Sequence, residues 1–351
     1  MRAALTCFAS LALLAACTDP PEAPPEPAPT STSATPPTES VSPTPEVEPS
    51  EPITIAFAGD IHFEGPLRER LDDPATALAP FTETLAAADL AVVNLETSVG
   101  EGGAPEPGKR FTFQAPPSAF DALTAAGVDV ATMANNHALD YGREALSSTF
   151  AAMRRTDLKV VGIGRDVDEA FRPAVVAVRG ATVAVLGATQ ATLDPTADPT
   201  GHWAATPTRP GTADAVDPTR LLRSVEAATQ SASVVVVYLH WGIQGDACPS
   251  AEQRELAVDL LRRGADVVVG SHAHVVQSAE QVGAAYLAYG LGNYAWYQPS
   301  DTGVLTLTVQ PPAEPAGGAV VTDAAWEPAR IGADGLPAVT GAPGQVPAPG
   351  C

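Results

Sequence analysis

The feature that most constrains the fold is an alternation of apolar runs with helical segments, which begins at Ile53 and continues through most of the chain. In the clearest unit, the continuous apolar run 234–239 precedes a segment in which Ser250 and Gln253 stand at capping-box spacing, and Gly264 follows that segment. A continuous apolar run suits a strand buried on both faces, and such strands are typical of sheets covered by helices. The sequence therefore predicts an α/β fold.

The same alternation predicts the remaining elements of one folded domain over residues 53–340, followed by a tail at 341–351. Strands are expected at residues 53–58, 90–93, 128–133, 160–161, 182–186, 266–269, 284–288 and 304–309, and helices at 81–88, 119–126 and 142–155. The segment Gly162-Ile163-Gly164 lacks the third glycine of a dinucleotide-binding fingerprint, so we expect a plain turn there.

Five of the six histidines stand just past the carboxyl end of a predicted strand, in IAFAGDIH, VATMANNH, VVVVYLH and VVVGSHAH. Glu96 has the same position in LAVVNLE. Ligands of open α/β sheets bind at the carboxyl ends of strands, which favours a shared metal site over satisfied core histidines. His202 has no strand before it and is expected to be a loop residue. The candidate ligands are Asp60, His62, Glu96, Asn136, His240, His272 and His274.

The ligand types indicate which metals would suit this site. Imidazole mixed with carboxylate and amide oxygen, without cysteine, suits Mn, Fe or Zn. Seven candidates are too many for one tetrahedral centre but natural for two divalent ions bridged by a carboxylate. Two such ions roughly 3.5–4 Å apart clamp a phosphoryl group and activate water. The sequence has no Gly-x-Ser-x-Gly elbow, His-Glu-x-x-His motif or phosphate-binding P-loop.

An ordered set of motifs extends this prediction: AGDIHF, NLETSV, FTFQAPP, ANNHALDYG, GIGR, LHWG, GADVVVGSHAHV and AYGLGNY. Their order resembles that of the bacterial CapA-type capsule-synthesis proteins, over about residues 53 to 310. This family is associated with poly-γ-glutamate and has a calcineurin-like metallophosphatase fold. The resemblance implies a sandwich of two central mixed β-sheets flanked by helices.

Carried over position by position, the resemblance also implies a role for each polar residue. His137 matches the histidine that acts as general acid toward the leaving oxygen, and Asp140 is placed to orient its imidazole. Glu96, at a position where the superfamily usually has aspartate, would bridge two ions. The first ion would be bound by Asp60, His62 and His274, and the second by Asn136, His240 and His272.

Cations are rare in this chain, and three of them are candidates for receiving an anionic substrate: Lys109, Arg110 and Arg165. Solvated surface charge is the alternative for all three. A further set either lines the mouth of the site or packs at a strand end: Tyr289, Asn293 and Tyr294.

The amino terminus reads as an export signal. Arg2 precedes an apolar run over residues 3–16, which is shorter than the roughly 20 residues that span a bilayer. The run ends in Leu-Ala-Ala-Cys, which resembles the bacterial lipoprotein box with Cys17 as the acylated residue; the alternative is an ordinary signal with a chance cysteine. Residues 18–52 are rich in Pro, Glu, Ser and Thr and are expected to form a disordered spacer. We therefore expect an extracytoplasmic, lipid-anchored protein.

The remaining cysteines and the net charge complete the expectations. Cys248 and Cys351 are left after Cys7 departs with the signal, and in an exported protein such a pair predicts a disulfide. The formal net charge of −22 argues against nucleic-acid partners, which are bound chiefly by neutralising phosphates.

Two functions remain open at this point. One is an anchored, metal-dependent hydrolase of phosphoester-type bonds that acts on a phosphoester or on an anionic cell-surface polymer. The other is a non-catalytic, metal-stabilised binding or assembly subunit of a poly-γ-glutamate synthesis and export complex. Other capsule-synthesis membrane proteins are the expected partners.

Overall fold

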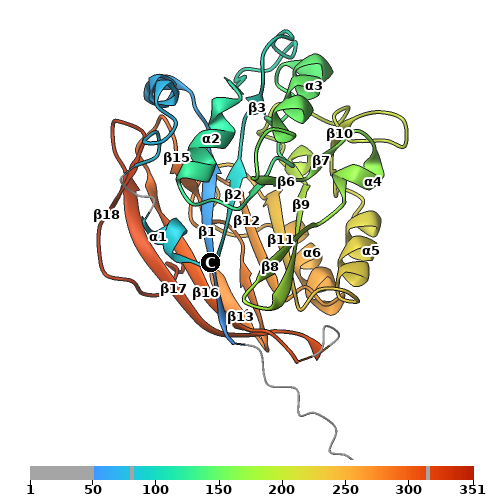
Figure 1. Ribbon diagram of the computed structural model, residues 1–351, viewed down its shortest axis with the longest axis vertical. Helices are drawn as coiled ribbons and strands as arrows, with labels where there is room; N and C mark the ends of the chain where they lie inside the picture. Colours follow the sequence, from blue (N-terminus) through green and yellow to red (C-terminus); the bar gives the residue numbers. More distant parts are fainter. Residues whose placement is uncertain (1–50, 80–82, 314–316) are drawn as a thin grey trace, which may run out of the picture. The chain divides into compact units, whose positions relative to one another are not determined.

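The computed structural model of the protein describes residues 51–79, 83–313 and 317–351 (Figure 1). The predicted signal peptide, the predicted acylation site Cys17 and the predicted spacer up to residue 50 lie outside the described residues. Among the described helices, none combines the length and the apolar character that crossing a membrane requires.

Two mixed sheets form the centre of the fold. The first runs in the order β18 (Pro337–Val339), β17 (Val320–Ile331), β16 (Asp301–Gln310), β1 (Ile53–Ile61), β2 (Leu90–Leu95), β5 (Val130–Thr132) and β6 (Lys159–Val161), and β15 (Asn293–Ala295) pairs with β1. The second runs in the order β13 (Ala279–Val282), β14 (Ala285–Ala288), β12 (Val267–His272), β11 (Val234–Trp241), β9 (Ala181–Thr189) and β8 (Ala174–Val178). Two short pairs join β3 (Ser98–Val99) to β4 (Gln114–Ala115) and β7 (Ile163–Gly164) to β10 (Gly211–Thr212).

The sheets pack face to face, and helices cover their outer faces (Figure 1). Phe57 and Val92 of the first sheet and Val185 and Val236 of the second belong to one buried apolar cluster between the sheets. The helices over the first sheet are α1 (Glu83–Ala87), α2 (Ser118–Ala125) and α3 (Gly142–Met153), and those over the second are α4 (Val167–Ala170), α5 (Thr219–Ala228) and α6 (Ala251–Arg262). Short 3₁₀ helices occur at η1 (Gly65–Leu67), η2 (Glu69–Asp72) and η3 (Ala191–Leu193). The predicted α/β sandwich with two mixed sheets is confirmed.

Local signals in the sequence account for much of this architecture. The capping box of α6 forms as predicted, and Gly264 follows the helix with φ 93°, a left-handed conformation that glycine adopts without strain. The expectation of a plain turn at residues 162–164 is wrong, because β7 pairs with β10 there. Helix α5 was missed, although Leu221, Val225 and Ala228 bury one face at helical spacing.

The carboxyl-terminal segment 341–351 is tied to the fold at three points. Gly344 exchanges main-chain hydrogen bonds with Trp326 of β17, at 2.7 and 2.8 Å, and Val346 packs into the cluster between the sheets. Cys351 then forms the predicted disulfide with Cys248, with their Cα atoms 5.6 Å apart. The segment therefore packs against the domain up to its last residue.

The strands that matter for the site are parallel within each sheet. β1, β2 and β5 run parallel in the first sheet, and β9, β11 and β12 run parallel in the second. Near their carboxyl ends the two sheets are joined by Tyr238, whose hydroxyl donates to the Ala58 carbonyl at 2.8 Å. Next in the chain, a Cβ at Gly59 would lie 1.9 Å from the Gly292 carbonyl oxygen, so only glycine permits this approach.

Candidate metal centre

The polar residues predicted at the strand ends meet where the carboxyl edges of the two sheets come together. Asp60 is the second-last residue of β1, and Glu96 directly follows β2. His240 lies inside β11 and His272 ends β12, because both strands extend beyond their predicted ends. The fully or almost fully buried members of the set are Asp60, His62, Glu96, Asn136, His137, His240 and His272.

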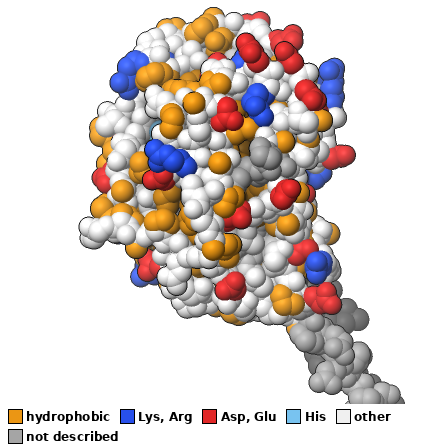
Figure 2. Space-filling model, turned by 90° about the vertical axis from the view of Figure 1, so that its left-hand side faces the viewer, with side chains coloured by type: hydrophobic (Ala, Val, Ile, Leu, Met, Phe, Trp, Pro, Cys, Tyr) orange, Lys and Arg blue, Asp and Glu red, His pale blue; other side chains and the backbone are white. Residues whose placement is uncertain are grey.

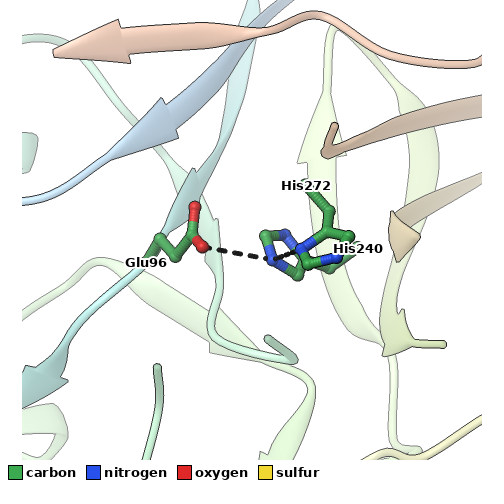
Figure 3. Close-up of side chains that lie close together, drawn as sticks. All are labelled: Glu96, His240 and His272. Carbon is green, nitrogen blue, oxygen red and sulfur yellow. Dashed lines mark hydrogen bonds and ion pairs between the residues drawn. The ribbon is translucent and has the colours of Figure 1, made fainter. Parts of the chain in front are cut away.

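Ligand atoms converge in two groups that share Glu96. Asp60, Glu96 and His274 form one group, and Glu96, His240 and His272 form the other, with the ligand atoms of each group within 4.8 Å of one another. Figure 3 shows the Glu96 carboxylate directed at His240, with His272 beside it. The Nε2 atom of His240 lies 3.3 Å from Glu96 Oε1 and 3.0 Å from His272 Nδ1. It also lies 2.7 Å from Asn136 Oδ1.

Buried atoms without partners test whether this cluster suits a cation. Within the part of the chain that the structure describes, both Glu96 carboxylate oxygens and His62 Nε2 are buried and have no hydrogen-bond partner. Burying an unpaired carboxylate is costly, and groups of this kind are normally paired or bound to a metal. The donor set of carboxylates, imidazoles and an amide fits a first-row divalent metal ion.

His62 is not brought into either group. Its Nδ1 accepts a hydrogen bond from the Glu64 N–H at 3.0 Å, so in a neutral ring the proton is on Nε2. Its ring packs against Trp296, with the ring centroids 4.0 Å apart. The structure therefore joins Asp60 and His274 to Glu96, while His62 stands beside the group with its Nε2 unpartnered.

One carboxylate in the cluster was not anticipated. Asp194 Oδ2 lies 3.1 Å from His272 Nε2, which leaves His272 Nδ1 facing His240. A carboxylate that holds the second nitrogen of a ligating histidine fixes the tautomer and raises the basicity of the ligand atom. Asp194 follows η3 beyond the end of β9, and the strand-end rule would have found it if the predicted strand had not stopped short, at residue 186.

Neutral side chains hold the ligands in place. Asn94 Nδ2 donates to Asp60 Oδ1 at 2.7 Å, and Asn135 Nδ2 donates to Asn94 Oδ1 at 3.0 Å. Ser271 Oγ lies 3.1 Å from His240 Nδ1. Sequence reasoning missed all three, although Asn94 and Asn135 lie within the NLE and ANNH motifs.

Backbone strain is concentrated at the same place. His272 has φ 95° and His274 has φ 58°, and among the described non-glycine residues only Arg179 shares this left-handed region. Such conformations cost on the order of 1–3 kcal/mol each and persist where the surrounding structure enforces them. The strained segment is the one that presents two imidazoles to the cluster.

His137 is paired with Asp140 and faces the cluster through its other nitrogen. Nδ1 lies 2.6 Å from Asp140 Oδ2, and Nε2 lies 3.8 Å from Glu96 Oε1. The imidazole stacks on Phe113, with the centroids 4.1 Å apart and the planes inclined by 13°. This is the geometry that the orienting role of Asp140 requires, and the role itself stays a prediction.

Burial sets the charge states of three of the imidazoles, those of His137, His240 and His272. It lowers the pKa of His240 to about 3 and that of His272 to about 4. Burial, followed by the charge of Lys109, lowers the pKa of His137 well below its usual range. Neutral imidazoles can bind a cation at neutral pH without first losing a proton.

The pKa values of the two buried carboxyl groups, Glu96 and Asp60, shift in opposite directions. Burial, together with the charge of Asp60, raises the pKa of Glu96 well above its usual range. Burial would also raise the pKa of Asp60, but its hydrogen bond from His274 and the nearby imidazoles lower it overall. For His274 burial acts downward, and the carboxylates of Glu96 and Asp60 raise its pKa to about 9. The cluster thus contains one strongly anionic oxygen donor, Asp60, and one carboxyl group, Glu96, whose charge needs compensation.

A cavity of about 280 Å³ opens onto this cluster. His137, His274 and Asn293 line it, and Asn293 Oδ1 accepts a hydrogen bond from His274 Nδ1 at 2.8 Å. Tyr289 and Tyr294 are buried in apolar clusters and are not among the lining residues.

The predicted substrate-binding cations do not line this cavity. Arg110 Nε binds Asp198 at 3.0 Å, and Arg165 binds Glu169 at 2.5 Å; both arginines are exposed. Lys109 is buried against Asp140. On the face shown in Figure 2, basic side chains lie apart from one another, so that face offers no continuous basic surface for a polyanion.

The fold and the cluster together define an α/β sandwich protein with a candidate metal centre at the carboxyl ends of its strands. The model of the family described as bacterial capsule synthesis protein PGA_cap matches residues 54–298. The chain belongs to this family, which confirms the resemblance seen in its motifs.

Relatives within the family are only partly matched. The PGA biosynthesis protein CapA of Bacillus subtilis (strain 168) is 30% identical over 251 residues, which cover 70% of this chain and 64% of the relative. The capsule biosynthesis protein CapA of Bacillus anthracis is 32% identical over 194 residues, which cover 54% of this chain and 45% of the relative. The chain thus spans about two thirds or less of each.

Among solved structures, the chain is similar to a putative 5'-nucleotidase from Staphylococcus aureus in complex with alpha-ketoglutarate. The sequence identity is 17% and the TM-score is 0.49, over 83% of this chain and 55% of the other.

Proposed function

We propose that this protein is a metal-dependent hydrolase of phosphoester-type bonds that serves capsule or poly-γ-glutamate biosynthesis. The observation that carries the proposal is Glu96, a buried carboxylate without hydrogen-bond partners that belongs to both groups of candidate ligands. An oriented imidazole, that of His137, faces the same carboxylate at 3.8 Å.

The proposed centre holds two divalent ions, for which Mn, Fe and Zn are the candidates. Such ions, when bound, polarise a phosphoryl oxygen and lower the pKa of water. Asp60 and His274 would hold one ion, with His62 as a further ligand only if its ring turns, and Asn136, His240 and His272 would hold the other. Glu96 would bridge them.

The part of the reaction that falls to the chain's own residues is proton transfer at the leaving oxygen. Asp140 engages Nδ1 of His137, so in the neutral ring Nε2 carries no proton. Nε2 would take up a proton from water and pass it to the leaving oxygen. Phe113 stacks on one face of the ring and shields it from water. Asn293 and the aromatic residues of the cavity mouth would contact the rest of the substrate.

The test combines elemental analysis of the purified protein with a panel of phosphoesters. We expect bound divalent metal and a hydrolysis rate that falls about 10²–10⁴-fold in His137→Ala, with the metal content unchanged. His202→Ala is the matched control, because His202 is exposed and lies outside both groups of ligands. Metal-loaded protein that hydrolyses none of the panel, or that keeps its full rate in His137→Ala, contradicts the proposal.

Variants of the same site distinguish the hydrolase from the alternative function, a non-catalytic assembly subunit. A metal-stabilised assembly subunit of a poly-γ-glutamate synthesis complex would tolerate His137→Ala but would fail when Asp60 or His274 is replaced. An enzyme would lose function with any of these changes. Polymer production in cells that carry each variant, measured beside hydrolysis in vitro, decides between the two.

The proposal includes an extracytoplasmic location with Cys17 acylated as the membrane anchor, close to other capsule-synthesis membrane proteins. The Cys248–Cys351 disulfide supports it, since disulfides persist mainly in oxidising compartments. Cys17→Ala is expected to move the protein out of the membrane fraction, whereas Cys7→Ala is the control that stays. Retention of the Cys17→Ala protein in membranes contradicts the anchor.

A further inference from the structure

Lys109 is a buried lysine at the back of the candidate general acid. It is one of only two lysines in the chain, and its side chain is 1% exposed. Its ammonium group donates hydrogen bonds to Asp140 Oδ1 and to the main-chain carbonyl of Asn136. The same nitrogen lies 3.5 Å from His137 Nδ1 and 4.8 Å from the centroid of the Trp203 ring. Among the described residues, its polar contacts therefore lie within residues 136–140, the segment that contains His137.

These contacts fix Asp140 in one orientation. Its Oδ1 accepts from Lys109, and its Oδ2 accepts from the Phe113 N–H at 2.6 Å and faces His137 Nδ1 at 2.6 Å. With both oxygens engaged, the carboxylate cannot rotate without breaking a charge-assisted hydrogen bond. The second bond from Lys109, to the carbonyl of Asn136, also holds the main chain directly before His137.

We propose that Lys109 is a positioning residue for His137: it locks Asp140 and the Asn136 main chain, so that the imidazole keeps its proton on Nδ1 and directs Nε2 at Glu96. Only the expected effect of Lys109 on kcat rests on the proposed hydrolase function. The orientation and tautomer of the imidazole do not depend on which bond, if any, is hydrolysed.

Burial alone does not explain a lysine here. A buried ammonium is expensive, and an apolar residue of similar size would pack against Trp203 at lower cost. An ammonium group can donate to a carboxylate and to a carbonyl oxygen at once, and it also brings the positive charge that compensates the carboxylate. Arginine also has these donors, but its planar fork differs in shape from the compact ammonium.

The test compares Lys109→Met with Lys159→Met, a matched control because Lys159 is exposed at the start of β6. The first measurement is the ¹⁵N NMR spectrum of labelled histidine in the purified full-length protein. In the parent protein we expect His137 to carry its proton on Nδ1, and in Lys109→Met a mixture of tautomers. Lys159→Met is expected to give the parent spectrum.

The second measurement is kinetic. Lys109→Met is expected to lower kcat about 10–100-fold with little change in KM or metal content, because the substrate and the metal ligands remain in place. Lys109→Arg, which keeps the charge and the donors, is expected to recover the Nδ1 tautomer and part of kcat. If Lys109→Met does not fold, Lys109→Gln replaces it, and a mixed tautomer is again expected.

The outcomes separate this inference from the proposed function. A folded Lys109→Met or Lys109→Gln protein with the parent tautomer and the parent kcat overturns the role of Lys109. A changed tautomer in a protein that hydrolyses no phosphoester supports the role of Lys109 and refutes the hydrolase. Equal losses in Lys109→Met and Lys159→Met would show a general effect of charge and also overturn it.

Discussion

Carboxylate side chains occur at both ends of the parallel strands, but their hydrogen bonding differs between the two ends. At the amino ends, aspartates that range from buried to exposed accept hydrogen bonds from main-chain groups of a neighbouring strand. At the carboxyl ends, Glu96 and His62 are buried with unpartnered atoms among the described residues. The contrast shows that the presence of a carboxylate at a strand end says little by itself. What distinguishes a ligand site is a buried donor set that the chain does not satisfy internally.

The amino-end aspartates repeat one arrangement three times. Each stands directly before a strand and accepts a hydrogen bond from the main-chain N–H near the start of the adjacent strand. The pairs are Asp89 with Thr54 at 2.9 Å, Asp129 with Ala91 at 2.8 Å, and Asp266 with Val235 at 2.8 Å. Asp266 also accepts from the Ala319 N–H at 2.9 Å. These carboxylates join strand starts, and both oxygens of Asp89 and of Asp266 are engaged within the chain.

Of the substitutions that test the difference between the two strand ends, Glu96→Gln is expected to have the largest effect. The neutral amide keeps the size of the side chain but removes the charge shared by both groups of ligands. We expect metal content to fall sharply and hydrolysis to fall at least about 10³-fold, which corresponds to about 4 kcal/mol. In metal-free protein the same change is expected to raise the free energy of unfolding by about 1 kcal/mol, because it removes an uncompensated buried carboxylate.

Asp89→Asn is the matched control at the amino end. Asp89 accepts from Thr54 and binds Arg179 Nε at 2.6 Å, so its charge is already compensated. The change should lower the free energy of unfolding by about 1 kcal/mol and leave metal content and hydrolysis unchanged. If chemical denaturation gives shifts of the same sign for Glu96→Gln and Asp89→Asn in metal-free protein, the contrast between the two ends is refuted.

The second expected effect concerns the Cys248–Cys351 disulfide, which lies near the carboxyl ends of the strands. The loop with Cys248 is joined to the strained histidine segment, since the Gly245 N–H donates to the Ala273 carbonyl at 2.8 Å. Cys351→Ser, which opens a bridge between residues 103 apart, is expected to lower the free energy of unfolding by about 2–5 kcal/mol. Hydrogen exchange should increase first in the loops around Cys248 and His274, and last at the strand starts. Uniform loss of protection would show that the bridge supports both ends equally.

The third effect is a pH dependence at the amino end. Burial raises the pKa of Asp266 to about 6 from 3.8, although two main-chain N–H groups oppose the shift. Between these values the folded state binds more protons than the unfolded state, so stability falls as the pH rises through this window. The full penalty, present above pH 6, is on the order of 3 kcal/mol. Urea denaturation of metal-free protein between pH 4 and 7 measures it, and Asp266→Asn should flatten the slope. An unchanged slope in that variant assigns the effect to other groups.

Local sequence patterns predicted many of the strands and the ligand cluster, whereas noncovalent side-chain contacts between distant residues could not be predicted from the sequence. Continuous apolar runs located β1, β2 and β11, and the histidines that follow such runs located the cluster. Those signals are local and repeat along the chain. β17 and α5 were missed, the first because exposed and half-exposed residues, such as Asp323 and Glu327, interrupt its apolar pattern. Side-chain pairing across loops has no local signal at all: Asp194 reaches His272, and Lys109 reaches Asp140, only after the chain has folded.

The lack of a local signal for contacts across loops also explains why the sequence could not assign separate roles to Lys109 and Arg110. Lys109 and Arg110 are neighbours in sequence, and both were candidates for an anionic substrate or for solvated surface charge. The fold separates them, because Lys109 turns inward to Asp140 while Arg110 stays exposed beside Asp198. Composition marked these residues as unusual, but only the packing of the loop decides what each one contacts.

Arg110→Ala provides the smallest expected effect. The guanidinium binds Asp198 and the Thr196 carbonyl, its side chain is 64% exposed, and it does not line the cavity. Exposed ion pairs contribute about 0–1 kcal/mol, so we expect less than about a threefold change in KM for an anionic phosphoester, and a similar change in Asp198→Ala. Steady-state kinetics at low and high salt measure both variants, since salt screens a long-range contribution of the charge. A rise in KM well above threefold in Arg110→Ala but not in Asp198→Ala would return Arg110 to the substrate site. The carboxyl-end centre would then depend on a cation outside its cavity, and the two strand ends would differ in their use of surface charge as well as in their buried carboxylates.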